Sequence, residues 1–450
     1  MTVQIAKTKA ETGLLESFGK VAGNLPGTPA VRALREAAIG RFAALGLPHR
    51  RIEEWKFTDL RAAVKEALPP ARLDKGAYEE EALAKALGRE LAGLTCIQLV
   101  FVDGEFLKAE MPASQAPGEA YQFDNLGHGL SSRGFEWIER HLEADKGPAA
   151  AIAALNTAFV TDGALLRIAD GQDMKLPIHL VFLSTGASPA STATRNLIRI
   201  GRGAKCTILE SHIAAGGAAH LDNAMTAIEA EDGASVRHVK VLVAGAAGTH
   251  LGTTHVRLGR DVSYRLFQMT TDSALVRNEI AVTFAGKGSS IDLSGAFLAR
   301  GSAHIDTTLL VDHAVAGCKS RELFKGVLDG RARGVFQGKV IVRPDAQKSD
   351  GKQMAQVLML SPDTEFDSKP ELEIYADDVV CGHGSTAAEI DEDLLFYCRS
   401  RGIPQKEARA LLIESFVGEA LEKVEDEDIR AALMARANAW LAAEQEDAST

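Results

Sequence analysis

The spacing of hydrophobic residues changes twice along this chain, near residue 160 and near residue 390. Up to residue 160, apolar positions recur every three or four residues, the period of a helix with one buried face. Thr28 and Pro29 are typical of a helix start, and Gly46 of a helix end. The pattern predicts helices over 28–46, 59–68, 78–91, 132–142 and 148–159, and a hairpin that begins with a strand over 96–102 and turns at Asp103-Gly104.

Beyond residue 160 the hydrophobic period becomes two, as in a β-strand with one buried face. Seven apolar pairs at positions i and i+2 follow one another at intervals of 26 to 32 residues, with small or turn-forming residues after each pair. These intervals are shorter than a propeller blade, and the leucine-rich-repeat signature is absent. The pairs are Ile198/Ile200, Ile228/Ala230, Val256/Leu258, Val282/Phe284, Leu309/Val311, Val340/Val342 and Leu372/Ile374.

A repeat of about 30 residues with little helical pattern inside it predicts a parallel β-helix, in which each coil stacks on the one before. An antiparallel sandwich with evenly spaced turns is the alternative. Helical periodicity returns over 391–400, 405–423 and 426–443. The predicted organisation is a helical region with a small β-hairpin over 1–160, a β-helix core over 161–388 and a C-terminal helical region over 389–450.

Composition narrows the classes of function. With 46% apolar and 25% charged residues, the chain is typical of globular proteins. Its net charge of −11 argues against nucleic acid or an anionic membrane as the main partner. No apolar run reaches the roughly 18 residues of a membrane span, and the first residues lack the apolar core of a secretion signal. Five scattered cysteines indicate a reducing compartment, so we expect a cytoplasmic protein.

One pair of residues is the main candidate for chemistry. Cys381 and His383 are two positions apart at the end of the last predicted strand, so both side chains leave the same face of that strand. A thiol and an imidazole are ligands for iron, copper or zinc. Gly382 and Gly384 leave room for another surface to approach. The chain has no Cys-x2-Cys motif, so a metal held here would need ligands from elsewhere in the fold or from a second chain.

Other polar groups have simpler interpretations. Glu371, Glu373, Asp377 and Asp378 could form an acid/base pair for sugar chemistry, but acids that alternate along a strand more often face water. Most histidines of the repeat region are predicted to face outward, and Cys96, Cys206, Cys318 and Cys398 to pack among apolar residues. The histidines in question are His212, His238, His250, His255, His304 and His313.

The glycine-rich segments lack the spacing of a phosphate-binding loop. No ATP site is therefore expected in this chain.

Several long segments resemble the SufB/SufD family of iron–sulfur cluster scaffold proteins. They are ELEIYADDVVCGHGST over 371–386, LFYCRSRGI over 395–403, FQGKVIV over 336–342 and AQKSDGKQ over 346–353. The N-terminal segment GLPHRRIEEWKFTDL over 46–60 resembles the SufD branch in particular. Many relatives have serine where this chain has Gly382, and alanine where it has Ser385.

The resemblance implies a right-handed parallel β-helix that pairs with SufB through the β-helices and binds the ABC-type ATPase SufC. It implies a scaffold subunit without enzymatic activity of its own, since the ATPase activity belongs to SufC. His383 corresponds to the family's cluster-site histidine and Cys381 to the neighbouring thiol, so the pair would hold a nascent iron–sulfur cluster shared with SufB. Sulfur would come from a cysteine desulfurase system. The residues expected to dock SufC are Leu394, Phe396, Arg399, Arg401 and Ile403.

Two other functions remain open at this point. A secreted β-helix enzyme that cleaves polysaccharides is one, although the unpaired cysteines argue against it. An adaptor that positions SufB and SufC without donating a ligand is the other. The isolated chain could also form a homodimer, and the sequence leaves flavin binding and the cluster type undetermined.

Overall fold

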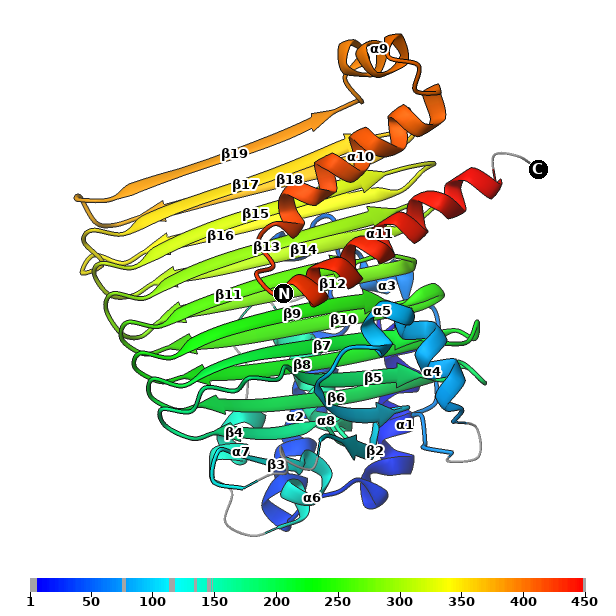
Figure 1. The fold of residues 1–450 in the computed structure, drawn as a ribbon. Helices are drawn as coiled ribbons and strands as arrows, with labels where there is room; N and C mark the ends of the chain where they lie inside the picture. The colour runs from blue at the N-terminus through cyan, green and yellow to red at the C-terminus, as the bar shows by residue number, and fades with distance from the viewer. Residues whose placement is uncertain are drawn as a thin grey trace.

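The computed structural model describes residues 6–74, 78–112, 118–132, 136–143, 147 and 149–447. Its centre is a β-solenoid whose coils stack along one axis (Figure 1). From β4 onward, successive strands alternate between two sheets, and each pairs in parallel with the strand two places along the chain. The predicted parallel β-helix is therefore confirmed. The hairpin β1–β2 turns at Asp103-Gly104 as predicted, with φ values of 48° and 83°.

The strands are β1 (Ile97–Val102), β2 (Glu105–Glu110), β3 (Tyr121–Asn125), β4 (Ala164–Ile168), β5 (Ile178–Ser184), β6 (Ala190–Ile200), β7 (Lys205–Ala214), β8 (His220–Ala230), β9 (Ser235–Val243), β10 (Gly245–Leu258), β11 (Ser263–Thr270), β12 (Ser273–Phe284), β13 (Ser290–Ala299), β14 (His304–His313), β15 (Lys319–Leu328), β16 (Arg333–Val342), β17 (Asp350–Met359), β18 (Glu365–Ile374) and β19 (Val380–Ala388). The helices are α1 (Lys9–Val21), α2 (Pro29–Leu45), α3 (Leu60–Ala63), α4 (Glu80–Leu87), α5 (Arg89–Ala92), α6 (Leu126–Ser131), α7 (Glu136–Leu142), α8 (Ala150–Phe159), α9 (Glu392–Ser400), α10 (Gln405–Leu421) and α11 (Glu427–Asp447), with short 3-10 turns at Ala22–Asn24 and Glu53–Trp55.

The seven apolar pairs lie on β6, β8, β10, β12, β14, β16 and β18, which are neighbours in the nine-stranded sheet. Six pairs stand directly in register. The Leu309/Val311 pair is two residues out, because Val311 and His313 are the residues aligned with Val282 and Phe284. His313 takes an apolar position of the ladder and is fully buried there, which explains why the sequence pattern shifted at this coil.

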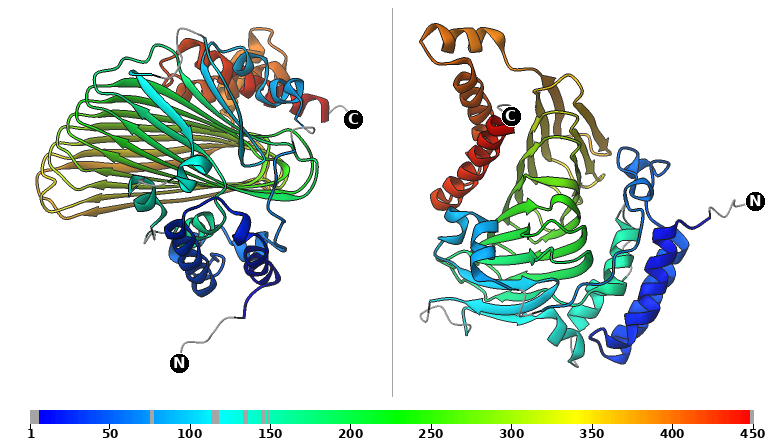
Figure 2. Two further views of the ribbon diagram at one scale, coloured as in Figure 1. Left: turned by 90° about the horizontal axis from the view of Figure 1, so that it is seen from below. Right: turned by 90° about the vertical axis from the view of Figure 1, so that its right-hand side faces the viewer.

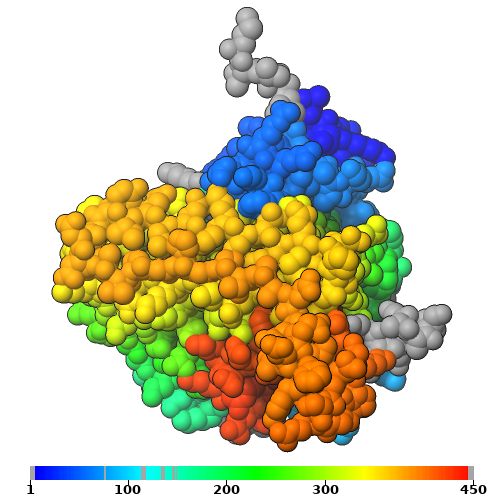
Figure 3. All heavy atoms as spheres, turned by 90° about the horizontal axis from the view of Figure 1, so that it is seen from above, coloured from blue at the N-terminus to red at the C-terminus, as the bar shows by residue number. Residues whose placement is uncertain are grey.

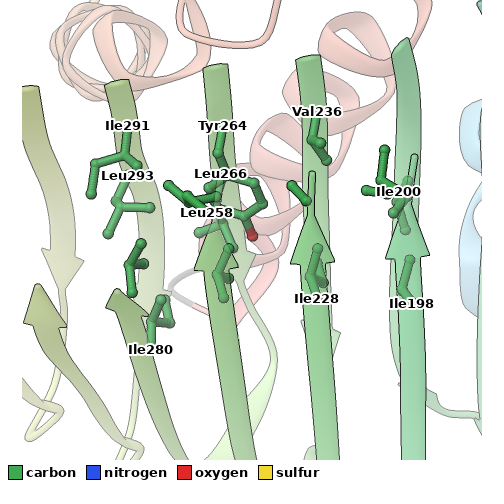
Figure 4. Close-up of a cluster of buried hydrophobic side chains, with 14 of the residues drawn as sticks. Ile198, Ile200, Ile228, Val236, Leu258, Tyr264, Leu266, Ile280, Ile291 and Leu293 are labelled. Carbon is green, nitrogen blue, oxygen red and sulfur yellow. The ribbon is translucent and has the colours of Figure 1, made fainter. Parts of the chain in front are cut away.

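These ladders form the inner core of the solenoid. Inward side chains from both sheets meet in one apolar cluster along the axis, with Ile228, Leu258 and Ile280 from one sheet and Tyr264 and Leu293 from the other (Figure 4). Each fully buried aliphatic side chain contributes about 1.5–3 kcal/mol relative to exposure. Stacking of equivalent coils therefore supplies most of the stability that no single coil could provide.

The inward faces also carry polar residues, and here the prediction for the histidines was wrong. His212, His238, His250 and His313 are buried on inward positions of their strands. His304 is partly buried and bonds to Thr58 Oγ1 at 2.8 Å. Strand alternation settles the side: a residue an even number of positions from an inward apolar residue also faces inward.

The helical parts cover the two outer faces of the solenoid (Figure 2). Helices α10 and α11, with α4 and α5, lie against the ten-stranded sheet and share a buried cluster with Leu209 and Val239. Helices α1, α2 and α8 lie against the nine-stranded sheet beside Leu221 and Leu251. The guanidinium of Arg277, on that sheet, stacks 3.9 Å from the centre of the Trp55 ring.

Several N-terminal helices differ from the prediction in length. The 28–46 helix is confirmed, with Thr28 as its N-cap and Gly46 as its C-cap. The 59–68 helix ends already at Ala63, and the 78–91 helix is divided at Gly88, where φ is 83°. The 132–142 helix is described from Glu136 onward, because 133–135 lie outside the described residues.

No helix among the described residues is long and apolar enough to cross a membrane.

Candidate metal site at the open end of the solenoid

The last strand of the ten-stranded sheet, β19, has a neighbour on one side only. It pairs with β17 and is the end member of its sheet, as β18 is of the other sheet. Seen from above, the segments around β18 and β19 form the end face of the molecule, and the N- and C-terminal parts lie to either side (Figure 3). Both strands are more exposed than any earlier pair of the solenoid. The free edges present backbone groups that another chain could pair with.

Cys381 and His383 lie on this end strand, opposite Gly351 and Gln353 of β17. Cys381 is half-buried and packs against the end of the inner core, so this face of β19 is the one that points into the solenoid. His383 is exposed on the same face. Burial raises the pKa of the Cys381 thiol, which keeps it protonated when no cation is near. A side chain at Gly382 would leave the opposite face of β19 and would meet nothing within 4 Å, so that outward face is open.

The pair has no third ligand of its own. Among the described residues, a group of three or more His, Cys, Asp or Glu ligand atoms occurs at His212, Asp222 and His250, and not at β19. A metal bound at Cys381 and His383 would thus have these two ligands from the described part of the chain.

Two buried polar residues lie in register beneath His383, and the sequence reasoning missed both. Gln353 of β17 is opposite His383, and Glu322 of β15 is opposite Gln353. Each is only 3% exposed. The Gln353 Oε1 and both carboxyl oxygens of Glu322 lack a hydrogen bond of good geometry among described residues. Burial raises the Glu322 pKa to about 8, so this carboxyl group is largely neutral at neutral pH.

Replacing Glu322 with glutamine should stabilise the chain at alkaline pH. The pKa of Glu322 is about 8 in the folded chain and 4.5 in the unfolded chain. The free energy of unfolding therefore falls as pH rises from 4.5 to about 8, because the unfolded chain releases this proton first, and it is unaffected below pH 4.5. The variant removes this cost but still buries an amide, so we expect a net gain of about 2 kcal/mol at pH 8 and a smaller one at pH 6. Urea unfolding at both pH values measures it. Glu365→Gln, at an exposed position, is the control. Equal pH slopes for the parent and Glu322→Gln would contradict the assignment.

The acids near the site are surface groups. Asp378 forms an ion pair with Lys348, and Glu371 lies 3.3 Å from Lys369. Glu373 Oε1 is 2.5 Å from Lys339 Nζ. Each carboxylate is thus neutralised by a lysine at the surface, and these contacts fit the water-facing interpretation better than an acid/base pair for sugar cleavage.

The helix that follows, α9, extends beyond the solenoid and touches α10 (Figure 1). Asp391 caps it by accepting from the backbone N–H groups of Asp393 and Leu394. Leu395 is buried and holds the helix in place, whereas Leu394 and Phe396 are 52% and 71% exposed. Arg399 and Arg401 are exposed beside them, and Ile403 is partly buried. The predicted docking residues thus bring apolar and basic groups to the same short segment.

The remaining cysteines are not part of this site. Cys206 and Cys318 are buried in the inner core, which confirms their role as small apolar side chains. Cys96 and Cys398 are partly buried, and the chain has five free cysteines.

Comparison with known proteins agrees with this architecture. Residues 182–416 match the family described as "SUF system FeS cluster assembly, SufBD core domain", and residues 24–180 match "SufBD protein N-terminal region". The iron–sulfur cluster assembly protein SufD of Escherichia coli is 27% identical over 87% of this chain and 88% of its own length. An iron–sulfur cluster assembly SufBD family protein of Synechocystis is 30% identical over 87% and 86%. SufD of Bacillus subtilis is 25% identical over 63% and 65%.

Proposed function

The chain belongs to the SufBD family of iron–sulfur cluster assembly proteins, and from this we propose that it is a SufD-type subunit that pairs with SufB, binds the ATPase SufC and donates a cluster ligand. One observation carries the proposal. A thiol and an imidazole share one face of an edge strand at the open end of the solenoid, without a third ligand among the described residues. A partner that covers this end would complete the shell.

Pairing with SufB uses the free edges of β18 and β19. Main-chain hydrogen bonds across such an edge add affinity, and side chains on either face add specificity. Tyr375 and Val380, which flank the turn between these strands, are 59% and 60% exposed. Such apolar side chains gain by burial in an interface. In the isolated chain the same edges would support a homodimer.

The nascent cluster is the cargo of this interface. His383 would bind iron through its imidazole, while SufB would supply the thiolate ligands, and mixed sulfur and nitrogen ligation is known for iron–sulfur sites. Cys381 is a second candidate ligand from this chain. ATP binding would favour the closed state of SufC, since a ligand shifts an equilibrium toward the state that it binds more tightly. This closure would change the SufB–SufD interface and release the cluster. Sulfur would reach the site from a cysteine desulfurase system.

The alternatives are less well supported. The comparisons do not favour a polysaccharide-cleaving enzyme, and three of the four candidate acids, Glu371, Glu373 and Asp378, are paired with lysines. An adaptor without a ligand role shares the family and the partners, so the His383 substitution described below separates it from the proposal.

A charge on the free edge tests the pairing. We expect Val380→Lys to weaken co-purification with SufB about 10-fold or more, since a lysine on an edge strand opposes pairing. SufC binding should be unchanged. Leu45→Lys, which also replaces an exposed apolar residue but on α2, is the matched control. Affinity for SufB that is the same in Val380→Lys and the parent would contradict pairing through β19.

A further inference from the structure

A second group of ligand atoms lies inside the solenoid, far along the stack from β19. It combines His212 of β7, Asp222 of β8 and His250 of β10. His212 Nδ1 is 3.0 Å and His250 Nδ1 is 2.8 Å from the same oxygen, Asp222 Oδ2. His250 and Asp222 are direct register partners, so the sheet itself sets their approach. Two imidazoles thus converge on one carboxylate in the interior of a single chain.

A small cavity adjoins this group. It has a volume of about 20 Å³, and the three residues line it together with His220 and Thr194. That volume holds one water or one ion. The two histidine side chains are 2–3% exposed and the Asp222 side chain 11%, so solvent reaches the group past the carboxylate. His250 Nε2 and His220 Nδ1 are buried without a hydrogen-bond partner among the described residues.

The surroundings orient the ligand atoms. Glu210 Oε1 lies 2.8 Å from His212 Nε2 and fixes the ring so that Nδ1 faces Asp222. A carboxylate behind a histidine is the usual outer contact of a metal-binding imidazole. Glu210 is fully buried, and Lys240 Nζ, 3.3 Å from its Oε1, balances its charge. An interior held together only by packing would not need five polar side chains here, because apolar residues of similar volume are usually at least as stable.

We propose that His212, Asp222 and His250 form a buried binding site for a divalent first-row transition metal ion. Two imidazoles and one carboxylate suit Fe²⁺, Co²⁺ or Zn²⁺, whereas Ca²⁺ and Mg²⁺ prefer oxygen ligands. The ion would replace the proton between His212 Nδ1 and Asp222, and this proton would leave to solvent. The proton on His250 Nδ1 would move to Nε2 of the same ring, which has no hydrogen-bond partner among the described residues, so one proton leaves in total. It would link strands from three successive coils. The site goes beyond the proposed function, because it needs neither SufB nor a cluster.

Metal binding to the full chain tests this site. The chain is stripped with chelator and titrated with Co²⁺, followed by visible absorption and calorimetry, and with Fe²⁺ under argon. All variants carry His383→Ala and Cys381→Ser, so that β19 does not contribute. We expect one equivalent of Co²⁺, a rise of several degrees in the unfolding midpoint, and binding at least 10-fold weaker in His250→Gln and Asp222→Asn.

His238→Gln is the matched control, because His238 is also buried and bonded to Glu210 but lies outside the group. It should bind Co²⁺ with less than a threefold change. No Co²⁺ or Fe²⁺ binding by the chain, or equal affinity in His250→Gln and its background, would overturn the proposal. If both ligand variants fail to fold, a crystal of the unmodified chain soaked in Co²⁺ decides: an anomalous peak between the three side chains supports the site, and cobalt found only elsewhere refutes it.

Discussion

Replacing His383 with alanine should lower cluster assembly on the reconstituted complex at least about 10-fold. Loss of a residue that only hydrogen-bonds to a metal ligand already costs about 10- to 100-fold, and loss of a ligand itself should cost no less. The side chain is exposed on an edge strand, so its removal costs the fold little. Complex formation with SufB and SufC should therefore persist. Iron and sulfide content, and absorption of the cluster under anaerobic reconstitution, measure the result.

Ser385→Ala is the matched control for this experiment, since Ser385 is two residues further along β19 and leaves the same face. It should assemble the cluster normally. Cys381→Ser in the same assay distinguishes a ligand from a packing residue, because serine has the same shape, although it is slightly smaller, and lacks the sulfur. Normal assembly by an intact His383→Ala complex would contradict the ligand role of His383, and normal assembly by Cys381→Ser as well would leave only the adaptor role. Loss of the complex itself would show that His383 is a structural contact.

Replacing Leu394 and Phe396 together with glutamate should abolish co-purification of SufC, a loss of at least about 100-fold in affinity. Two large apolar side chains that are more than half exposed have the properties of interface anchors, and each buried one is worth about 1.5–3 kcal/mol. The fold should survive, because the buried Leu395 still anchors α9. Pull-down of SufC and of SufB on the same sample gives both readouts.

Glu392→Gln, at the exposed start of α9, should retain SufC and serves as the control. SufB pairing should be intact in the double variant as well. Loss of SufB together with SufC would indicate misfolding of the C-terminal part, and retention of SufC would place its docking surface elsewhere on the chain.

The repeat of the solenoid could be predicted from the sequence because the inner core imposes it. Ile228, Val256 and Val282 stand in one ladder, and a residue facing the axis must be apolar unless a partner satisfies it. The exception was the coil of β14, where His313 fills an apolar position by bonding to Ser320 Oγ at 3.1 Å. The sequence around a buried polar residue does not show that it is buried when its hydrogen-bond partner lies on another strand.

The inward orientation of His250 and Asp222 could have been predicted from strand alternation. His250 is six residues before Val256, and Asp222 is six before Ile228, so alternation places both on the inward face. The outward prediction for the histidines applied alternation without counting from the nearest inward apolar residue. The contact of Asp222 with His212 could not be predicted in this way. It depends on how closely the two sheets approach, which the sequence of one strand does not encode.

The site on β19 was also predicted only in part from the sequence. The spacing of Cys381 and His383 predicted a common face, and the structure places both on β19. The stack of Gln353 and Glu322 beneath His383 depends on the register of β15, β17 and β19, which the degenerate repeats did not fix. In the proposal the further ligands come from SufB, so the sequence of this chain alone could not predict them.

The most direct measurement is a structure of this chain bound to SufB and SufC with a cluster in place. The proposal predicts that an imidazole nitrogen of His383 coordinates iron at the β-helix interface, beside a thiolate from SufB. An interface in which His383 faces its own solenoid or open solvent, with all iron ligands supplied by SufB, would contradict it.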